Sequence, residues 1–361
     1  MDYPSSISEI QECVRSQPRV VTRGGGTKPA LYFGSEASTL EMTHLQGLIE
    51  YQPEEFTFTA WAGSRLTDVE QALTEHDQFL PFDPVLVERG STLGGMVASG
   101  LSGSGRYRFG GLRDFVLGLK FVDGLGNLVR SGGKVVKNAA GFDLSKFMVG
   151  SLGQYGVLVE LTFKVFPRPA AYATLKAEYA SLANALEACS RLAALPLELF
   201  ALDVAPNDKG CTLLIRLGGQ PEILVGRMQR LNAILEGANV KAREYQEVAG
   251  ASEAEIWRIA REFLWVEPDQ TLVKVPLTPR RIAALDEQLT ALDALRRYCV
   301  GGSLAWVAWP GPLSKLDDIL AGQGLSGLAI IGTVDSPLIG LRTGDEFARR
   351  VKKALDPHGK F

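Results

Sequence analysis

Histidine and closely spaced cysteine are scarce in this sequence. Its 361 residues include three histidines and four cysteines, and the cysteines (Cys13, Cys189, Cys211 and Cys299) form no C-x-x-C pair. This spacing argues against an iron–sulfur cluster or a structural zinc ion bound by the chain, so we predict no metal site. Isolated thiols are typical of proteins in a reducing cytoplasm.

Long hydrophobic runs and a large net charge are also absent. No apolar run approaches the roughly 18 residues that a membrane span requires, and the N-terminal MDYPSSISEIQECVRS lacks the pattern of a signal peptide. A net charge of −3 gives no reason to expect nucleic acid or an anionic membrane as a partner. The 46% hydrophobic content favours a globular cytoplasmic protein, and the length favours two domains.

Glycine is abundant, and it is unevenly distributed. Residues 90–156 hold 17 of the 39 glycines, whereas the sequence after KVFPRPA (164–170) is rich in alanine and leucine. This change predicts a domain boundary near the two prolines of that segment. We therefore expect a first domain over residues 1–169, a second over 170–335 and a C-terminal helix, 336–361, that returns to the first domain.

Hydrophobic periodicity predicts the elements of both domains. In the first domain we expect helices over 7–14 and 66–79, a β-hairpin over 114–132 and a long strand after residue 156. In the second, the order strand, helix, strand, strand, helix, strand occurs twice, over 171–247 and 271–332, which suggests two ferredoxin-like units. The last helix is expected to begin with a capping box at Thr343 and Glu346.

Three consecutive glycines in VVTRGGGTKP (20–29) indicate a loop whose backbone N–H groups bind a phosphate. The adjacent glycines do not fit the P-loop spacing G-x-x-x-x-G-K-[ST]. Nor does SGSGRYRFGG (102–111) supply the third glycine of a dinucleotide-binding fingerprint. Phosphate binding is therefore predicted without either of the two common motifs.

The sequence resembles the FAD-binding domain of the vanillyl-alcohol oxidase and p-cresol methylhydroxylase (PCMH) family. Three blocks carry this resemblance in order: TRGGGTK (22–28), the glycine-rich stretch from GSTLGGMVASG to VRSGG (90–133), and KNAAGFDLSKFMVGSLGQYGVLVELTFKVFPRP (137–169). Within the family, the chain is most similar to the FAD-binding subunits of glycolate oxidase. The resemblance implies an α+β fold: a two-subdomain PCMH-type FAD-binding domain followed by an α+β cap domain built of ferredoxin-like β-α-β-β-α-β units.

The resemblance also implies a set of residues that bind FAD. They are Arg23, Gly24, Gly25, Gly26, Thr27, Lys28, Pro84, Gly90, Ser91, Thr92, Gly94, Gly95, Ala98, Gly103, Arg113, Asp114, Gly150, Gly153, Gly156 and Val157. Arg23 and Lys28 are each compatible with a phosphate contact and with a solvated loop position. Many family members attach flavin through a histidine or cysteine, but Thr27 occupies the first position and residues 90–114 contain neither residue type. We therefore expect non-covalent FAD.

Catalytic residues are not assigned. Catalytic relatives in the family carry an H-x-H-x-G-D-G-N segment in the cap domain, and the corresponding region here is GGSLAWVAWPGP (301–312), which has no histidine. Arg106, Arg108 and Arg113 are compatible with a carboxylate contact, and equally with loop solvation or an ion pair. Trp306 and Trp309 fit a pocket, but alternating aromatic residues in a strand are more often core.

Three functions remain open at this stage. The first is the FAD-binding subunit of a multi-subunit 2-hydroxy-acid dehydrogenase, with glycolate oxidase favoured, in which electrons pass between a catalytic flavoprotein subunit and an iron–sulfur subunit. Such a complex would act on a small 2-hydroxy acid and would reach a membrane only through its partners. The second is a self-sufficient FAD-dependent dehydrogenase of a hydroxy acid or alcohol. The third is an assembly subunit that retains the cofactor fold without turnover. Relatives usually continue past DPHGKF, so we expect the C-terminus to be trimmed.

Overall fold

The computed structural model describes residues 2–32, 37–133 and 143–361, and these residues form two compact units. The first unit comprises Met1–Gly103, Gly110–Arg168 and Thr343–Phe361, and the second comprises Ser104–Phe109 and Pro169–Arg342. The predicted domain boundaries after residues 169 and 335 stay predictions, and the assignment of 104–109 to the second unit was not anticipated. The start of the third sequence block, residues 137–142, lies outside the described residues.

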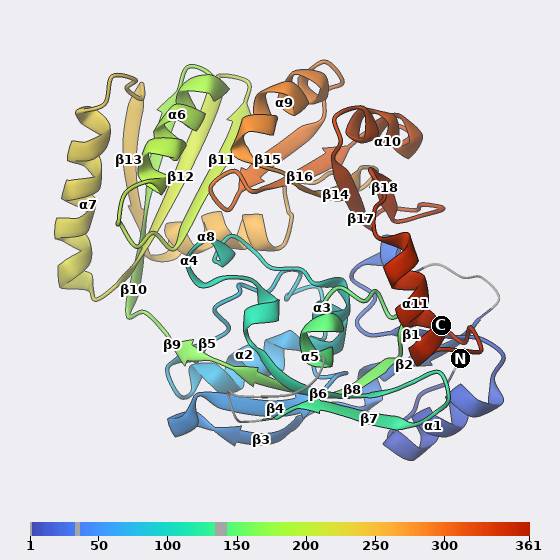
Figure 1. The fold of residues 1–361 in the computed structure, drawn as a ribbon. Coiled ribbons are helices and arrows are strands. Elements are labelled where there is room, and N and C mark those ends of the chain that lie inside the picture. The colour runs from blue at the N-terminus through green and yellow to red at the C-terminus, as the bar shows by residue number, and fades with distance from the viewer. Residues whose placement is uncertain (1, 33–36, 134–142) are drawn as a thin grey trace. The chain divides into compact units, whose positions relative to one another are not determined.

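The first unit is organised around an antiparallel sheet (Figure 1). Its strand order is β3 (Leu48–Gln52), β4 (Thr57–Trp61), β8 (Val157–Lys164), β6 (Val116–Val122) and β7 (Leu128–Gly132). Two shorter pairs accompany it: β1 (Val20–Arg23) with β2 (Ser38–Glu41), and β5 (Gln78–Phe79) with β9 (Phe166–Pro167). The helices are α1 (Ile7–Ser16), α2 (Leu66–Thr74), α3 (Leu93–Ser99), α5 (Leu144–Phe147) and α11 (Asp345–Leu355).

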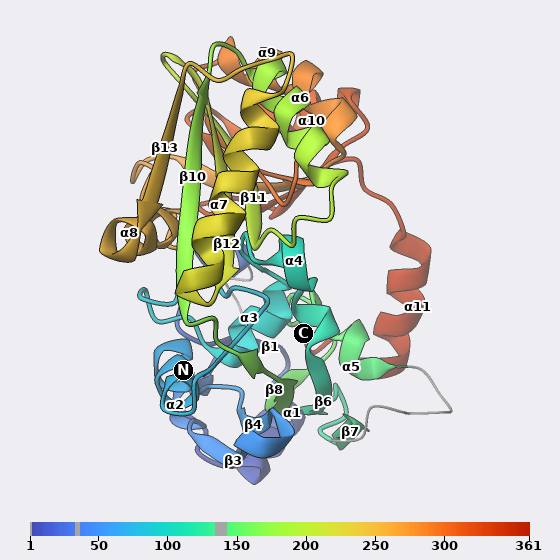
Figure 2. The same cartoon turned by 90° about the vertical axis from the view of Figure 1, so that its left-hand side faces the viewer.

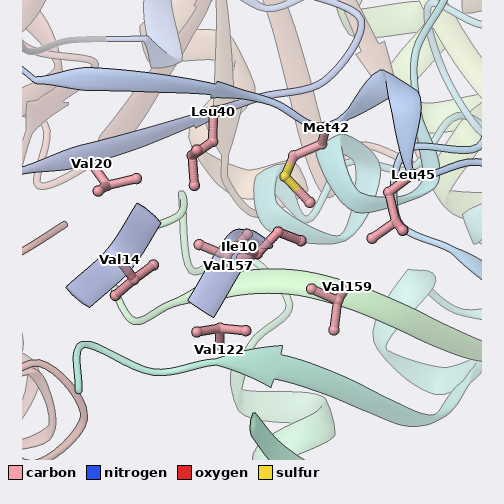
Figure 3. Close-up of a cluster of buried hydrophobic side chains, with 9 residues drawn as sticks. All are labelled: Ile10, Val14, Val20, Leu40, Met42, Leu45, Val122, Val157 and Val159. Carbon is pink, nitrogen blue, oxygen red and sulfur yellow. The ribbon is translucent and has the colours of Figure 1, made fainter. Parts of the chain in front are cut away.

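A core cluster joins helix α1 to the strands around it. Ile10 and Val14, one helical turn apart, are fully buried against Val20, Leu40, Met42, Leu45, Val122, Val157 and Val159. Figure 3 shows Ile10 between the chain that carries Leu40 and Met42 and the strand that carries Val157 and Val159. The helix begins at Ser6, whose hydroxyl accepts a hydrogen bond from the Glu9 N–H. Burial of these side chains fixes β1, and hence the start of the glycine loop that follows it.

Two predicted helices differ from the observed ones. The expected helix over 66–79 ends at Thr74, and Phe79 lies in strand β5, where it pairs with Phe166. Asp77 adopts a left-handed backbone conformation (φ 53°), which an α-helix does not permit. The expected capping box at Thr343 and Glu346 is also wrong, because the N-cap of α11 is Gly344 (φ 84°) and receives no side-chain hydrogen bond.

The C-terminal segment packs within the first unit. The Gly124 N–H donates to the Leu355 carbonyl at 2.8 Å, and the Val20 N–H donates to the Lys360 carbonyl at 2.6 Å. Asp356 is almost fully buried and accepts from the N–H groups of Lys360 and Phe361. Burial alone would raise the pKa of Asp356, but Lys352 and these N–H groups hold it below its usual range. The last residues are therefore part of the structure that supports β1.

The second unit contains two ferredoxin-like halves in one antiparallel sheet (Figure 2). The strand order is β13 (Glu244–Ala249), β10 (Ala171–Tyr179), β12 (Gly210–Gly219), β11 (Ala201–Asn207), β15 (Leu295–Cys299), β16 (Leu304–Trp309), β14 (Thr271–Pro276), β17 (Ser326–Ile331) and β18 (Leu338–Gly340). Each half has the order 4-1-3-2, and the halves meet where Val204 pairs with Tyr298. The predicted duplication is confirmed.

Helices cover both faces of this sheet. The expected helices are α6 (Leu182–Ala193), α7 (Pro221–Glu236), α9 (Ile282–Thr290) and α10 (Leu313–Gly322). The opposite face is covered by α8 (Gly250–Arg261), which the sequence did not predict, and α4 (Arg106–Phe109) also belongs to this unit. Figure 2 shows α8 and α7 on opposite sides of strands β10 and β13. Trp306 and Trp309 are buried, as expected for core residues.

Candidate cofactor site

A cavity of about 290 Å³ lies in the first unit, at the end of strand β1. This volume is near the lower limit of roughly 300 Å³ for small-molecule sites. Twelve of the predicted site residues line it: Arg23, Gly24, Gly25, Gly26, Thr27, Lys28, Thr92, Gly94, Gly95, Ala98, Gly153 and Gly156. All three sequence blocks therefore contribute to one cavity, as the resemblance implied.

Packing against residues 90–92 explains two glycines of the loop. A Cβ on Gly25 would lie 1.8 Å from the Gly90 carbonyl oxygen, and one on Gly24 would lie 2.3 Å from Thr92 Oγ1. Both distances are impossible for real atoms, and Gly26 has a φ of 66° that disfavours other residues. Glycine is required at positions 24 and 25 because another segment of the chain, 90–92, lies directly against this backbone.

The loop held in this way presents hydrogen-bond donors. Within the described ranges, the N–H groups of Gly25, Gly26 and Thr27 donate to no other residue. Gly25 and Gly26 are exposed, and both line the cavity together with Thr27. Successive free N–H groups form a concave site for an anion. The loop thus fits the diphosphate of a dinucleotide, and the glycines that shape it leave no room for a Cβ.

The second block enters the cavity through the start of α3. Thr92 is the N-cap, and its hydroxyl accepts from the Gly95 N–H at 3.2 Å. Gly94 donates its N–H to the Ala62 carbonyl at 2.7 Å, and a Cβ there would lie 2.9 Å from that residue. Gly94 is therefore required by close packing of α3 on the end of β4. Ala98, one turn after Gly94, lines the same wall.

The remaining predicted residues do not line the cavity. Ser91 and Gly90 are directly behind it, since Ser91 Oγ is 2.9 Å from Thr27 Oγ1. Gly103 donates its N–H to the Asp83 carbonyl, next to Pro84, and Asp114 accepts from the Gly111 N–H. The others of this group are Arg113, Gly150 and Val157. An FAD-binding role for any of these residues stays a prediction.

Nine lining residues were not predicted: Thr22, Pro29, Leu31, Tyr32, Met42, Ala62, Ser99, Leu152 and Leu158. Most are apolar and occur in sequence as ordinary core positions. Leu158, for example, lies between Val157 and Val159 of the core cluster, and Met42 belongs to both the cluster and the cavity wall. Their role follows from three-dimensional proximity, and no sequence pattern distinguishes them.

Comparisons with known proteins identify the family of this chain. A model of the FAD binding domain family matches residues 2–132. Over its full length the chain is 31% identical to the glycolate oxidase subunit GlcE of Escherichia coli, and it covers 96% of that protein. The chain belongs to the GlcE family.

Two further proteins are similar to this chain at lower sequence identity. Glycolate oxidase subunit GlcD of Bacillus subtilis is 28% identical over 276 residues, which are 69% of this chain and 58% of GlcD. A solved structure of alkyldihydroxyacetonephosphate synthase has a TM-score of 0.72 at 16% identity, covering 99% of this chain and 75% of the other. That likeness shows the fold. The predicted α+β fold, the FAD cofactor and the class of FAD-dependent oxidoreductase are confirmed.

Within residues 2–32, 37–133 and 143–361, no group of three or more His, Cys, Asp or Glu side chains has the arrangement of a metal site. No helix there combines the length and apolar character that crossing a bilayer requires.

Proposed function

We propose that this chain is the FAD-binding subunit of a complex that oxidises glycolate, and that it relays electrons between a flavoprotein subunit and an iron–sulfur subunit in the cytoplasm. The observation that carries the proposal is the cavity of the first unit, which residues of all three sequence blocks line, in a chain that matches GlcE over its full length. When bound, FAD supplies two-electron acceptance and one-electron release. The chain's own contribution is to bind and orient it.

The lining residues support non-covalent binding. Covalent flavin attachment needs a nucleophilic side chain such as histidine or cysteine, and Thr27 occupies the first-loop position. The residues of the described chain that line the cavity include neither histidine nor cysteine. Affinity would come from the N–H groups of Gly25, Gly26 and Thr27 and from apolar contacts of residues such as Leu31 and Leu158. We therefore propose that FAD is held reversibly.

The distribution of histidine supports a relay over independent catalysis. Oxidation of a 2-hydroxy acid requires a base for the hydroxyl proton, and histidine is the usual choice near neutral pH. All three histidines, His44, His76 and His358, belong to the first unit, and none lines the cavity. The second unit, which corresponds to the cap of catalytic relatives, contains no histidine. A partner subunit would then supply the base.

Anaerobic flavin spectroscopy tests the proposal. The purified chain is loaded with FAD and mixed with glycolate, then with D-lactate, while the visible flavin bands are recorded. We expect the bands to stay unchanged with the chain alone and to bleach when the chain is co-purified with the other subunits of its complex. Bleaching by the chain alone would establish independent oxidation. Failure to take up FAD at all would contradict the proposal and point to an assembly role.

A further inference from the structure

Lys28, Thr27 and Ser91 form a compact polar group at the cavity wall. Lys28 Nζ is 3.0 Å from Thr27 Oγ1 and 3.1 Å from Ser91 Oγ, and the two hydroxyl oxygens are 2.9 Å apart. The three side chains come from two sequence blocks that are more than sixty residues apart. The glycine loop and the 90–92 segment are therefore joined by polar side chains as well as by close backbone packing.

This group of three side chains has more hydrogen-bond donors than acceptors and lacks a negative charge. A lysine ammonium has three N–H donors, and two of them are directed to the Thr27 and Ser91 oxygens. One of these hydroxyls donates to the other, so one hydroxyl hydrogen and one ammonium hydrogen form no hydrogen bond with the residues that the structure describes. Lys28 forms no ion pair with any residue in the described parts of the chain. The group is thus rich in donors and has no negative charge.

Burial makes the absence of an anionic partner for the Lys28 ammonium energetically unfavourable. Lys28 is partly buried, and loss of solvation lowers its pKa to about 8. A desolvated cation is stable only when an anion or strong acceptors compensate for the lost water. Thr27 and Ser91 supply neutral oxygens only. Close beside them in the chain, Gly25, Gly26 and Thr27 line the same cavity as Lys28, and their N–H groups donate to no residue of the described ranges.

Arg23 does not fill this role. Its guanidinium is 3.4 Å from the Glu41 carboxylate and 5.9 Å from the centre of the Tyr32 ring. Its positive charge is therefore already paired. Arg23 and Tyr32 are the other titratable side chains that line the cavity, whereas the segment from Ser91 to Gly95 adds no charge. The sequence left Arg23 and Lys28 equivalent, and the structure separates them.

We infer that Lys28, positioned by Thr27 and Ser91, is the side-chain counter-charge for the diphosphate of FAD. This inference rests on the proposed function and adds a charged ligand to a site otherwise made of backbone N–H groups. Diphosphate binding then depends on protonation of one lysine. The chain would bind FAD more weakly as the pH rises through the range in which Lys28 loses its proton.

Binding of FAD and of riboflavin, which has the same ring but no phosphate, tests the inference. The FAD-free chain, Lys28→Met and the control Lys353→Met, at an exposed site on α11, are titrated at pH 7 by quenching of flavin fluorescence. We expect Lys28→Met to weaken FAD binding by about 10- to 100-fold, as for loss of one charge-assisted hydrogen bond. Riboflavin binding should be unchanged, and the control should match the unmodified chain for both ligands.

Each other result has a definite meaning. Equal binding of FAD by Lys28→Met and the unmodified chain overturns the inference, as does an equal loss for FAD and riboflavin. Absence of FAD binding by the unmodified chain contradicts the proposed function instead. If Lys28→Met does not fold, the unmodified chain is titrated from pH 7 to pH 9. A selective loss of FAD affinity relative to riboflavin supports the inference, and parallel changes overturn it.

Discussion

Glu253 on α8 accepts two hydrogen bonds from Arg216 on β12, at 2.8 Å from Nε and 3.2 Å from Nη2. Glu253 is 2% exposed, and Thr174 also donates to it. The Trp257 indole N–H in turn donates to the Thr174 hydroxyl at 2.8 Å. This network attaches α8 to the sheet of the second unit through groups whose hydrogen bonds are satisfied.

Replacing Glu253 by alanine should strongly destabilise the second unit. The change leaves the Arg216 guanidinium poorly solvated and without its counter-charge, and breaking a buried pair in this way costs about 3 kcal/mol or more. Glu255→Ala on the same helix removes the exposed, solvent-screened pair with Arg258 and should cost much less. Urea denaturation followed by circular dichroism measures both. Similar losses for the two variants would contradict this account.

Replacing Gly25 by alanine should release FAD. The new Cβ would lie 1.8 Å from the Gly90 carbonyl, so the glycine loop must move away from residues 90–92. The N–H groups of the loop would then no longer be aligned for a diphosphate. Gly226→Ala in α7 is the control, because no atom lies within 4 Å of its added Cβ and the change stabilises a helix interior by about 1 kcal/mol. Flavin content after gel filtration should fall for Gly25→Ala only.

Lys28→Met should stabilise the FAD-free chain while weakening FAD binding. Burial lowers the pKa of Lys28 from 10.5 to about 8 in the folded chain. Between these pH values the unfolded chain binds more protons, so the free energy of unfolding rises with pH there and is lower below pH 8. Removing the charge should raise the free energy of unfolding at pH 7 by about 3 kcal/mol.

The pH profile provides the check on that prediction. Thermal unfolding of FAD-free Lys28→Met, the exposed-site control Lys353→Met and the unmodified chain is compared from pH 7 to pH 10.5. The advantage of Lys28→Met should shrink as pH approaches 10.5, and Lys353→Met should follow the unmodified chain. A constant difference across the range would show that the lysine charge is not responsible.

Asp203→Asn should change the pH dependence of stability in the second unit. Burial raises the pKa of Asp203 above 3.8, although the Ser104 hydroxyl, the Cys299 thiol and the Val300 N–H act in the other direction. A carboxyl whose pKa is raised on folding destabilises the fold as pH rises through that raised value. The variant should therefore gain stability relative to the unmodified chain as pH rises above 4. Asp208→Asn, at an exposed site, should show no such gain.

The two ferredoxin-like units were predictable because strand and helix periodicity recurs in the same order, and each element buries its own apolar stripe. Helix α8 was not, because burial of Glu253 depends on Arg216, which lies in a strand thirty-seven residues earlier. The end of α2 was missed because a left-handed Asp77 has no distinctive sequence signal. Local patterns therefore predicted elements, whereas long-range charge pairing and backbone conformation decided the exceptions.

In the cofactor site, too, some residues were predictable from the sequence and others depended on long-range contacts. The glycines of the first loop were predicted because three in a row indicate a closely approached backbone, whereas Thr27 and Thr92 were implied by the family resemblance. The apolar wall, including Met42 and Leu158, was not, because leucine and methionine serve equally in a core. The difference between Arg23 and Lys28 also required the structure, since only the position of Glu41 shows which cation is already paired.

The hydrogen bond from Val20 to the Lys360 carbonyl has a consequence for synthesis of the chain on the ribosome. Residues 343–361 belong to the first unit, so that unit lacks a component until these residues have been translated. The second unit, whose last residue is Arg342, has all its residues earlier and can fold while the ribosome is still elongating the chain. Flavin uptake would then have to wait until residues 343–361 have been made, and a nascent chain stalled before residue 343 should carry no flavin.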